Sequence, residues 1–165
     1  LAADALGVKL LHEASLKRLL EHCSEIPDDR AVLRAIHFFE ENKRVEQAAA
    51  SIRQKDYGEL LHLITLSGIS SWKYLQNCYS IRNCHEQKVS LTLALTELFF
   101  KGMAGDDPCN GACRIHGGGF AGVIMCVLPQ AQAQRYAAFI SRYVGAENVY
   151  PMKIRNVGAV RIGDV

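Results

Sequence analysis

The sequence predicts an α+β fold in which a small antiparallel sheet packs against several helices. Apolar residues recur at helical spacing through most of residues 8–103. A short Val- and Ile-rich run over residues 121–128 then ends at Pro129, which is typical of a buried strand. A glycine-rich loop precedes that run, and a segment with helical spacing follows it. In this order, helices are followed by a strand, a loop, a second strand, a helix and a further strand. Such an order favours an α+β domain.

The length of 165 residues fits a single domain, with a helical part over residues 1–104 and a glycine-loop part over residues 105–165. A chain of this size can bury a core without disulfides or metals. It begins Leu-Ala-Ala-Asp-Ala-Leu-Gly, without an initiator methionine and within a helical pattern. We therefore expect a fragment of a longer, two-domain protein.

The first helices are predicted from leucine spacing and from start and stop signals. Leucines recur near helical spacing over residues 8–22, with charged residues on the other face. Pro27 ends any helix before it, and Asp28 or Asp29 can cap the next one. Residues 29–54 then form a long charged helix with an apolar stripe.

Two further helices are predicted before the glycine-rich stretch. One opens at residues 56–58, and an apolar one covers residues 86–103. The Gly-Asp-Asp-Pro turn at residues 105–108 ends the second. Its acidic pair, Asp106 and Asp107, fits a turn better than a metal site, because turns favour Asp, Gly and Pro.

The C-terminal part continues with a helix and then strands. Residues 130–144 have helical spacing, and Gly145 ends that helix. Residues 149–162 show the alternation of one or two strands, and Pro151 favours an edge position.

Charge and cysteine content exclude several classes of protein. The net charge is +2, from 19 basic and 17 acidic residues, without the basic run that indicates a nucleic-acid partner. No apolar run approaches the roughly 18 residues of a membrane helix, and no signal peptide opens the chain. The six cysteines lack zinc-binding spacing. Free thiols, including a buried Cys126, are therefore expected in a cytoplasmic protein, with a Cys78–Cys84 disulfide as the alternative.

The glycine-rich stretch over residues 111–122 reads Gly-Ala-Cys-Arg-Ile-His-Gly-Gly-Gly-Phe-Ala-Gly. Glycine runs occur where the backbone needs positive φ or close approach, and their N–H groups can hold a phosphate. Gly117, Gly119 and Gly122 fit a dinucleotide-binding pattern, but a strand follows instead of the required helix. A Walker-type loop is excluded because no Gly-Lys-Ser/Thr follows. A glycine-rich turn without a ligand remains the alternative.

This stretch resembles the third conserved motif of the GHMP small-molecule kinases, and most of all that of galactokinases. The glycines, arginine, phenylalanine and following strand fall in the order of the pattern Gly-Ala-Arg-Met-Thr/His-Gly-Gly-Gly-Phe-Gly/Ala-Gly. Cys113 departs from it by standing before the arginine, and Ala121 replaces a common glycine. The resemblance is strong over residues 111–129 and looser over residues 30–80.

A second resemblance lies in the first long helix. Galactokinases carry His-x-x-x-Glu-x-x-Arg-Val on a helix, and this chain has His37 and Arg44, with Glu40 or Glu41 at the glutamate position. These charged residues are expected to face solvent, as most charged helix positions do. A departure follows at Gly68, which stands after a serine where the family often has histidine.

The resemblance implies the C-terminal domain of a GHMP kinase, with a ferredoxin-like sheet, in an enzyme that uses ATP and Mg²⁺ to phosphorylate a sugar, galactose first among them. The residues that it places beside the nucleotide phosphates are Gly117, Gly118, Gly119 and Phe120. Arg114 and His116 would support this loop from the strand that leads into it. A paired arginine on the sheet surface and a hydrogen-bonded histidine that steadies the loop are the structural alternatives.

No catalytic residue is expected in this chain. It contains neither a Gly-Leu-Ser-Ser-Ser-like ATP loop nor the Gly-Glu-His-x-Asp of the family's sugar-binding stretch. The resemblance therefore implies an N-terminal kinase domain of the same protein as the partner, without which the fragment is inactive. The surface that this domain would cover is expected to be apolar, and dimers of the fragment could hide it.

Two other functions remain open. The first is a non-catalytic, galactokinase-like module that senses a sugar or nucleotide, which the departures at Gly68, Cys113 and Ala121 allow. The second is an unrelated ferredoxin-like ligand-binding domain. The sole tryptophan, Trp72, is expected to be a packing anchor, with stacking on a sugar ring as the alternative.

Overall fold

A computed structural model describes residues 1–102, 109–119 and 122–154. Its helices are α1 (Ala2–Ala5), α2 (Leu16–His22), α3 (Asp29–Gln54), α4 (Tyr57–Ser70), α5 (Lys88–Phe100) and α6 (Ala133–Val144). Its strands are β1 (Ala112–Ile115) and β2 (Ile124–Val127). A π-helical turn at Ser71–Leu75 continues α4, and 3-10 turns lie at Leu11–Glu13, Cys23–Glu25, Gln130–Gln132 and Ala146–Asn148.

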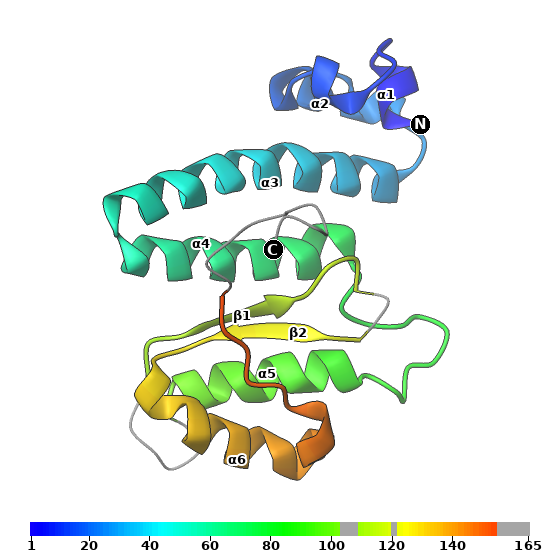
Figure 1. Cartoon of the computed structure of the whole chain (residues 1–165). Helices are drawn as coiled ribbons and strands as arrows, with labels where there is room; N and C mark the ends of the chain where they lie inside the picture. The colour runs from blue at the N-terminus through cyan, green and yellow to red at the C-terminus, as the bar shows by residue number, and fades with distance from the viewer. Residues whose placement is uncertain (103–108, 120–121, 155–165) are drawn as a thin grey trace, which may run out of the picture.

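The elements are stacked in layers (Figure 1). From the N-terminal end of the molecule, the order is α1 with α2, then α3, α4, the β1–β2 hairpin, α5 and α6. Within the described residues the sheet is a two-stranded antiparallel hairpin, and the rest is mostly helical. This architecture agrees with the predicted α+β class.

The two long N-terminal helices begin where their sequence signals place them. The Asp28 carboxylate accepts hydrogen bonds from the backbone N–H groups of Arg30 and Ala31, at 2.9 and 3.2 Å, and so caps α3. Asp56 caps α4 in the same way, by accepting from the N–H of Glu59 at 3.0 Å. Of the two aspartates that could cap α3, the cap is therefore Asp28.

The predicted helix over residues 8–22 is shorter than expected. Residues Leu11–Glu13 form only a 3-10 turn, and α2 begins after Ser15, whose side chain accepts from the N–H of Arg18 at 3.2 Å. A serine in this position satisfies the first turn of a new helix better than it continues an old one. Leu19 of α2 is fully buried and packs with Leu6 against α3.

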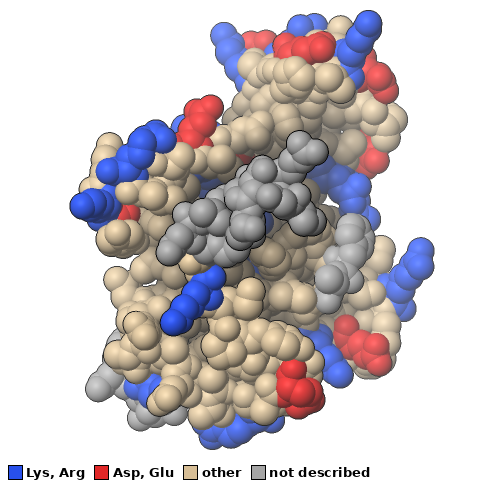
Figure 2. Space-filling model, in the orientation of Figure 1, with Lys and Arg blue, Asp and Glu red and all other residues tan. Residues whose placement is uncertain are grey.

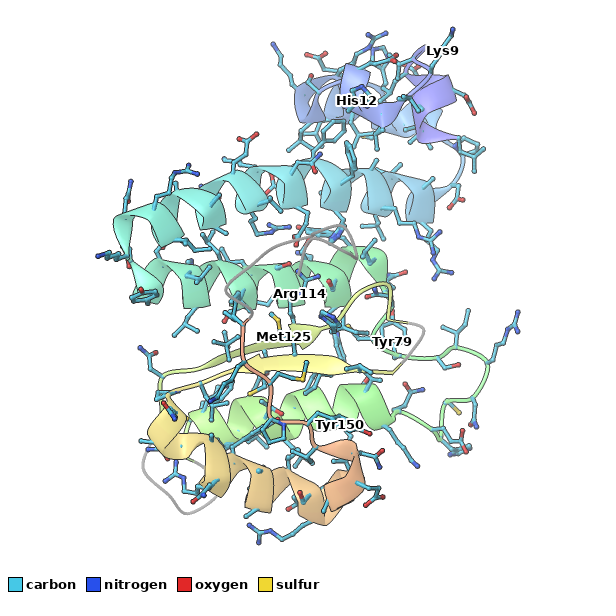
Figure 3. The ribbon with its side chains drawn as sticks, viewed as in Figure 1. Lys9, His12, Tyr79, Arg114, Met125 and Tyr150 are labelled. Atoms are coloured by element: carbon cyan, nitrogen blue, oxygen red, sulfur yellow. The ribbon has the colours of Figure 1, made fainter. Side chains whose placement is uncertain are left out.

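The hairpin has one face toward α5 and one toward α4, because successive strand residues point in opposite directions. Cys113 pairs with Cys126 across the strands, and Ile115 pairs with Ile124; both pairs lie in the cluster packed on α5. Arg114, paired with Met125, points to the other face, between β1 and α4 (Figure 3).

Helix α4 lies very close to β1 at Gly68. A Cβ atom added there would lie 2.9 Å from the carbonyl oxygen of Cys113 and 3.3 Å from the Cβ of Arg114. Neither atom can move without moving β1, so no side chain fits at this position. The glycine at position 68, where galactokinases often have histidine, is therefore explained by the packing of this chain. The close approach of α4 to β1 also brings Ser67 within reach of Arg114.

A second core lies between α5 and α6. Phe99 is fully buried, and its ring lies 5.3 Å from the rings of both Tyr136 and Phe139. The hydroxyl groups of Thr96 and Tyr136 are hydrogen-bonded at 2.8 Å, which satisfies two polar groups inside this apolar cluster. The amphipathic pattern predicted for residues 130–144 thus produces α6.

The prediction of strands over residues 149–162 is wrong for the part that the structure describes. Residues 149–154 contain no strand, and the side chains of Met152 and Ile154 are 85% and 98% exposed. Alternation alone cannot form a strand that has no neighbour to pair with. Residues 155–162, like the predicted turn with Asp106 and Asp107, lie outside the described residues.

The surface agrees with the composition. On the face that Figure 2 shows, basic and acidic side chains are interspersed over the N-terminal helices, and no broad area of one sign appears. No helix in the described ranges combines the length and apolar character that crossing a membrane requires.

Candidate functional site

The glycine stretch forms the turn of the β1–β2 hairpin. The turn opens at His116, whose backbone N–H donates to the carbonyl oxygen of Val123 at 2.8 Å. Gly117 and Gly119 have φ angles of +61° and +86°, which L side chains rarely adopt. Gly117 and Gly118 are solvent-exposed. The turn therefore needs glycine for its conformation and presents bare backbone at the surface.

A second segment supports the turn from the side. The side-chain amide of Asn77 donates to the carbonyl oxygen of Gly118 at 3.2 Å. A Cβ atom on Gly119 would lie 2.6 Å from the carbonyl oxygen of Asn77 and 2.9 Å from the Cδ1 of Ile115. Gly119 is thus required both by its φ angle and by close approach. Phe120 lies outside the described residues.

Arg114 is bound on three sides by protein groups. Its Nη1 donates to Ser67 Oγ at 2.6 Å and to Glu41 Oε1 at 3.1 Å, and its Nε donates to the carbonyl oxygen of Ile115 at 3.1 Å. These partners belong to α4, α3 and β1. The structure therefore places Arg114 in a half-buried ion pair beneath α4, where it ties the strand that leads into the turn to two helices.

Glu41 is the centre of this polar network. Its Oε1 accepts from Arg114 and from the Ser67 hydroxyl, while its Oε2 accepts from the Nε of Arg44 at 2.8 Å. The Oε2 of Glu40 lies 3.7 Å from the Nη1 of Arg44. The side chain of Glu40 is 38% exposed, compared with 20% for Glu41. The expectation that these helix residues face solvent is therefore wrong for Glu41 and Arg44.

The two guanidinium groups explain how a carboxylate is tolerated between α3 and α4. Burial by itself would raise the pKa of Glu41, but hydrogen bonds from Ser67 and Arg44 and the charges of Arg44 and Arg114 outweigh it and hold that pKa below its ordinary value. Glu41 is therefore ionised at neutral pH, as its ion pairs require.

His37 lies one turn before Glu41 on α3 and is linked to the end of α4. Its Nδ1 is hydrogen-bonded to Ser70 Oγ at 2.9 Å. Burial, together with the charges of Arg44 and Arg114, lowers the pKa of His37 despite the opposing charge of Glu41. His37 is therefore neutral in the folded protein at neutral pH.

These shifts predict that acid destabilises the domain in two steps. The folded pKa of His37 lies below its ordinary value of 6.5, so below pH 6.5 the unfolded chain takes up a proton first and the free energy of unfolding falls. The folded pKa of Glu41 lies below its ordinary value of 4.5, which gives a second decrease below pH 4.5. Urea denaturation from pH 8 to pH 4 measures both.

The matched control is His37→Gln, which keeps a hydrogen-bonding side chain without a titrating ring. This variant should show a smaller decrease between pH 6.5 and pH 5 than the unaltered chain, and the same decrease below pH 4.5. Equal slopes in both proteins above pH 5 would show that another group titrates there.

The remaining candidates have structural positions of their own. His116 is exposed at the start of the turn, and its described hydrogen bond comes from its backbone N–H. All six cysteines are free thiols, as predicted. Burial raises the pKa values of the Cys113 and Cys126 thiols to about 12, so both are protonated and inert at neutral pH. No three His, Cys, Asp or Glu side chains within the described ranges converge on a possible metal site.

Trp72 packs on a neighbouring aromatic ring, as expected of a packing anchor, but it does so at the surface. Its side chain is 43% exposed and packs against Tyr79, with ring centroids 5.8 Å apart. In Figure 3, Tyr79 lies at the same end of the sheet as the hairpin turn. Trp72 is in the π-helical turn Ser71–Leu75, where the chain leaves α4.

Sequence reasoning missed Ser67, Ser70 and Asn77 as members of the site. Ser67 and Ser70 are three residues apart on α4, so they lie on one face of the helix and reach Glu41 and His37 on the neighbouring helix. The spacings of three residues on α4 and four on α3 each place a pair of side chains on one helix face, which was a usable signal. No comparable signal marks Asn77, because its contact with Gly118 spans 41 residues of sequence.

Fold and site together define an α+β domain whose glycine-rich hairpin turn is supported by a half-buried network of ion pairs. No protein-family model matches the chain. Curated relatives do: the chain is 28% identical over 142 residues to galactokinases of Actinobacillus pleuropneumoniae and of Glaesserella parasuis serovar 5. Each match includes 85% of this chain and 33% of the relative, so the chain spans about a third of the length of the curated relatives it matches.

Proposed function

We propose that the chain is the C-terminal domain of an ATP-dependent sugar kinase of the GHMP superfamily. The proposed reaction is that of a galactokinase, in which the γ-phosphoryl group of ATP is transferred to galactose to give galactose 1-phosphate and ADP in the cytoplasm. Residues 1–165 form one domain in this proposal, and the rest of the enzyme precedes it.

One observation carries the proposal. The two segments that resemble galactokinases are separate in the sequence, yet Glu41 of the first and Arg114 of the second form an ion pair with 3.1 Å between Nη1 and Oε1. Chance similarity in two short stretches gives no reason for their charged residues to meet inside the fold. The 28% identity to galactokinases over 142 residues also supports the proposal.

The contribution of this domain to the reaction is a backbone surface. Phosphoryl transfer depends on positioning and on stabilising the negative charge of the transferred group. The turn at Gly117–Gly119 is exposed at its first two glycines and can offer N–H groups to a phosphate, and the positive φ angles at Gly117 and Gly119 orient successive N–H groups differently from a regular strand. In this proposal Arg114 and His116 act as supports for the turn, and Phe120, which lies outside the described residues, is assigned to the same phosphate-proximal loop.

The other parts of the enzyme belong to the upstream segment. We assign to it the main ATP loop, the residues that read the sugar and the catalytic base. Mg²⁺ would arrive with the nucleotide and bind mainly to that segment, where it would neutralise phosphate charge. This chain supplies no general base in the proposal, and alone it is inactive.

The test is ADP release by the protein extended upstream, measured against a panel of sugars that includes galactose. We expect turnover with galactose, and loss of turnover in Gly118→Val, whose branched side chain obstructs the turn. The 165-residue chain alone should release no ADP in response to a sugar. Sugar-dependent turnover by this chain alone would overturn the assignment of the base, and a folded extended protein that binds sugar without turnover would instead be a sensing module.

A further inference from the structure

Asn77 is fixed on both sides by its neighbours in the connector between α4 and α5. Gln76 is in the left-handed conformation, with a φ angle of +54°, and its N–H donates to the carbonyl oxygen of Ser71 at 2.9 Å. Cys78 is buried, and its carbonyl oxygen accepts from Ser90 Oγ on α5 at 2.9 Å. The backbone on each side of Asn77 is therefore anchored to a helix.

The side chain of Asn77 uses both ends of its amide. Its Nδ2 donates to the carbonyl oxygen of Gly118 at 3.2 Å, and its Oδ1 lies 3.7 Å from the Sγ of Cys78, which donates to it. The carbonyl oxygen of Asn77 also lies against Gly119, where a Cβ would come within 2.6 Å. One anchored residue thus contacts the two glycines in the middle of the turn.

A peptide unit is planar, and its C=O and N–H groups point in opposite directions. A hydrogen bond that holds the carbonyl oxygen of Gly118 toward Asn77 therefore turns the N–H of Gly119 away from Asn77. Glycine itself restricts its neighbouring dihedral angles very little, so the orientation of this peptide depends on outside contacts: the hydrogen bond from Asn77, the packing of Gly119 against the Asn77 carbonyl oxygen, and the hydrogen bond from the N–H of Gly122 to the carbonyl oxygen of Gly119 at 3.2 Å.

We propose that Asn77 is the positioning residue of the glycine turn: it fixes the Gly118–Gly119 peptide so that the N–H of Gly119 is presented to a phosphate group. The inference rests on the proposed function for the identity of that ligand. An amide is required at residue 77 because the hydrogen bond to the Gly118 carbonyl oxygen needs a donor, and in asparagine that donor is the side-chain nitrogen. Aspartate has the same shape but lacks the donor and adds a negative charge beside the phosphate position.

The first experiment measures the order of the turn by ¹⁵N relaxation of the 165-residue chain. In the unaltered chain the amides of Gly118 and Gly119 should have order parameters near the rigid value of about 0.85, and in Asn77→Ala these should fall below about 0.6. Melting temperatures should stay within about 2 °C, because the bond is solvent-facing. Unchanged order parameters in Asn77→Ala would overturn the proposal.

The second experiment measures the affinity of the same proteins for inorganic pyrophosphate from shifts of the glycine amide resonances. The dissociation constant should rise roughly 3- to 10-fold in Asn77→Ala, as expected for one lost neutral hydrogen bond, and further in Asn77→Asp. The matched control is Asn83→Asp, an exposed site where Oδ1 accepts from the N–H of His85 at 3.1 Å, so that aspartate keeps the bond while adding the same charge.

The outcomes distinguish the role of Asn77 in positioning the turn from the role of the turn in binding phosphate. Equal weakening by Asn83→Asp and Asn77→Asp would show a general charge effect and would overturn the role of Asn77. If the unaltered chain does not bind pyrophosphate, the phosphate role of the turn in the proposed function fails, and the relaxation measurement alone then decides whether Asn77 positions the turn.

Discussion

Glu41→Ala should lower the free energy of unfolding by about 2–4 kcal/mol, because it leaves the guanidinium groups of Arg44 and Arg114 half-buried without their shared carboxylate. This loss is at the lower end of what breaking a buried ion pair costs, because the side chains of Glu41 and Arg114 remain 20% and 26% exposed. The contacts that would be weakened are those between α3, α4 and β1. Urea denaturation at pH 7 measures it.

Glu40→Ala is the matched control for this prediction. Glu40 is the adjacent residue on the same helix, but its side chain is more exposed, and it lies 3.7 Å from Arg44. Its loss should change the free energy of unfolding by less than about 1 kcal/mol, as for other surface ion pairs. Equal effects of the two substitutions would mean that the network does not depend on Glu41.

A double-mutant cycle then isolates the link between the helix and the hairpin. If Glu41 and Arg114 act as a pair, Glu41→Ala and Arg114→Ala together should destabilise less than the sum of the two single changes, with a coupling of roughly 1–3 kcal/mol. Additive effects would mean that Arg114 is held mainly by Ser67 and by the carbonyl oxygen of Ile115.

Much of the fold could be predicted because it rests on local signals. Aspartate caps, helical spacing and the strand–glycine–strand order are properties of short segments, and they placed α3, α4, α5, α6 and the hairpin. The prediction of strands over residues 149–162 had no such support, because alternation does not show whether a partner strand exists. Ser15 was a capping signal for the start of a new helix, but the leucine spacing across it predicted one continuous helix.

The site was harder to predict, because its parts meet only in the folded chain. The glycine turn was visible in the sequence, since three consecutive glycines would weaken the interior of a helix or a strand and are favoured in tight turns. Its supports were not visible: Glu41 looks like any charged residue of an exposed helix, but in the fold it lies against Ser67 of α4 and Arg114 of β1. Burial of a charge depends on the partners that folding brings to it, and sequence periodicity cannot supply them.

The largest effect on the turn itself is expected for Gly119→Ala. Alanine at a φ angle of +86° is strained, and its Cβ would lie 2.6 Å from the carbonyl oxygen of Asn77 and 2.9 Å from the fully buried Ile115. Backbone strain of about 1–2 kcal/mol and overpacking of about 1–3 kcal/mol would act together, so we expect a loss of roughly 2–5 kcal/mol in the free energy of unfolding or a displaced turn.

Gly117→Ala separates these two causes within the same turn. Gly117 has a similar left-handed conformation, with a φ angle of +61°, but among the described residues no atom beyond its own chain neighbours lies within 4 Å of the position that its Cβ would occupy. It should therefore lose only the strain of about 1–2 kcal/mol. Chemical denaturation gives the two energies, and amide spectra show whether the signals of Asn77 and Ile115 shift only in Gly119→Ala. Similar losses and unshifted signals in both variants would mean that backbone conformation alone, without close packing on Asn77, requires glycine in this turn.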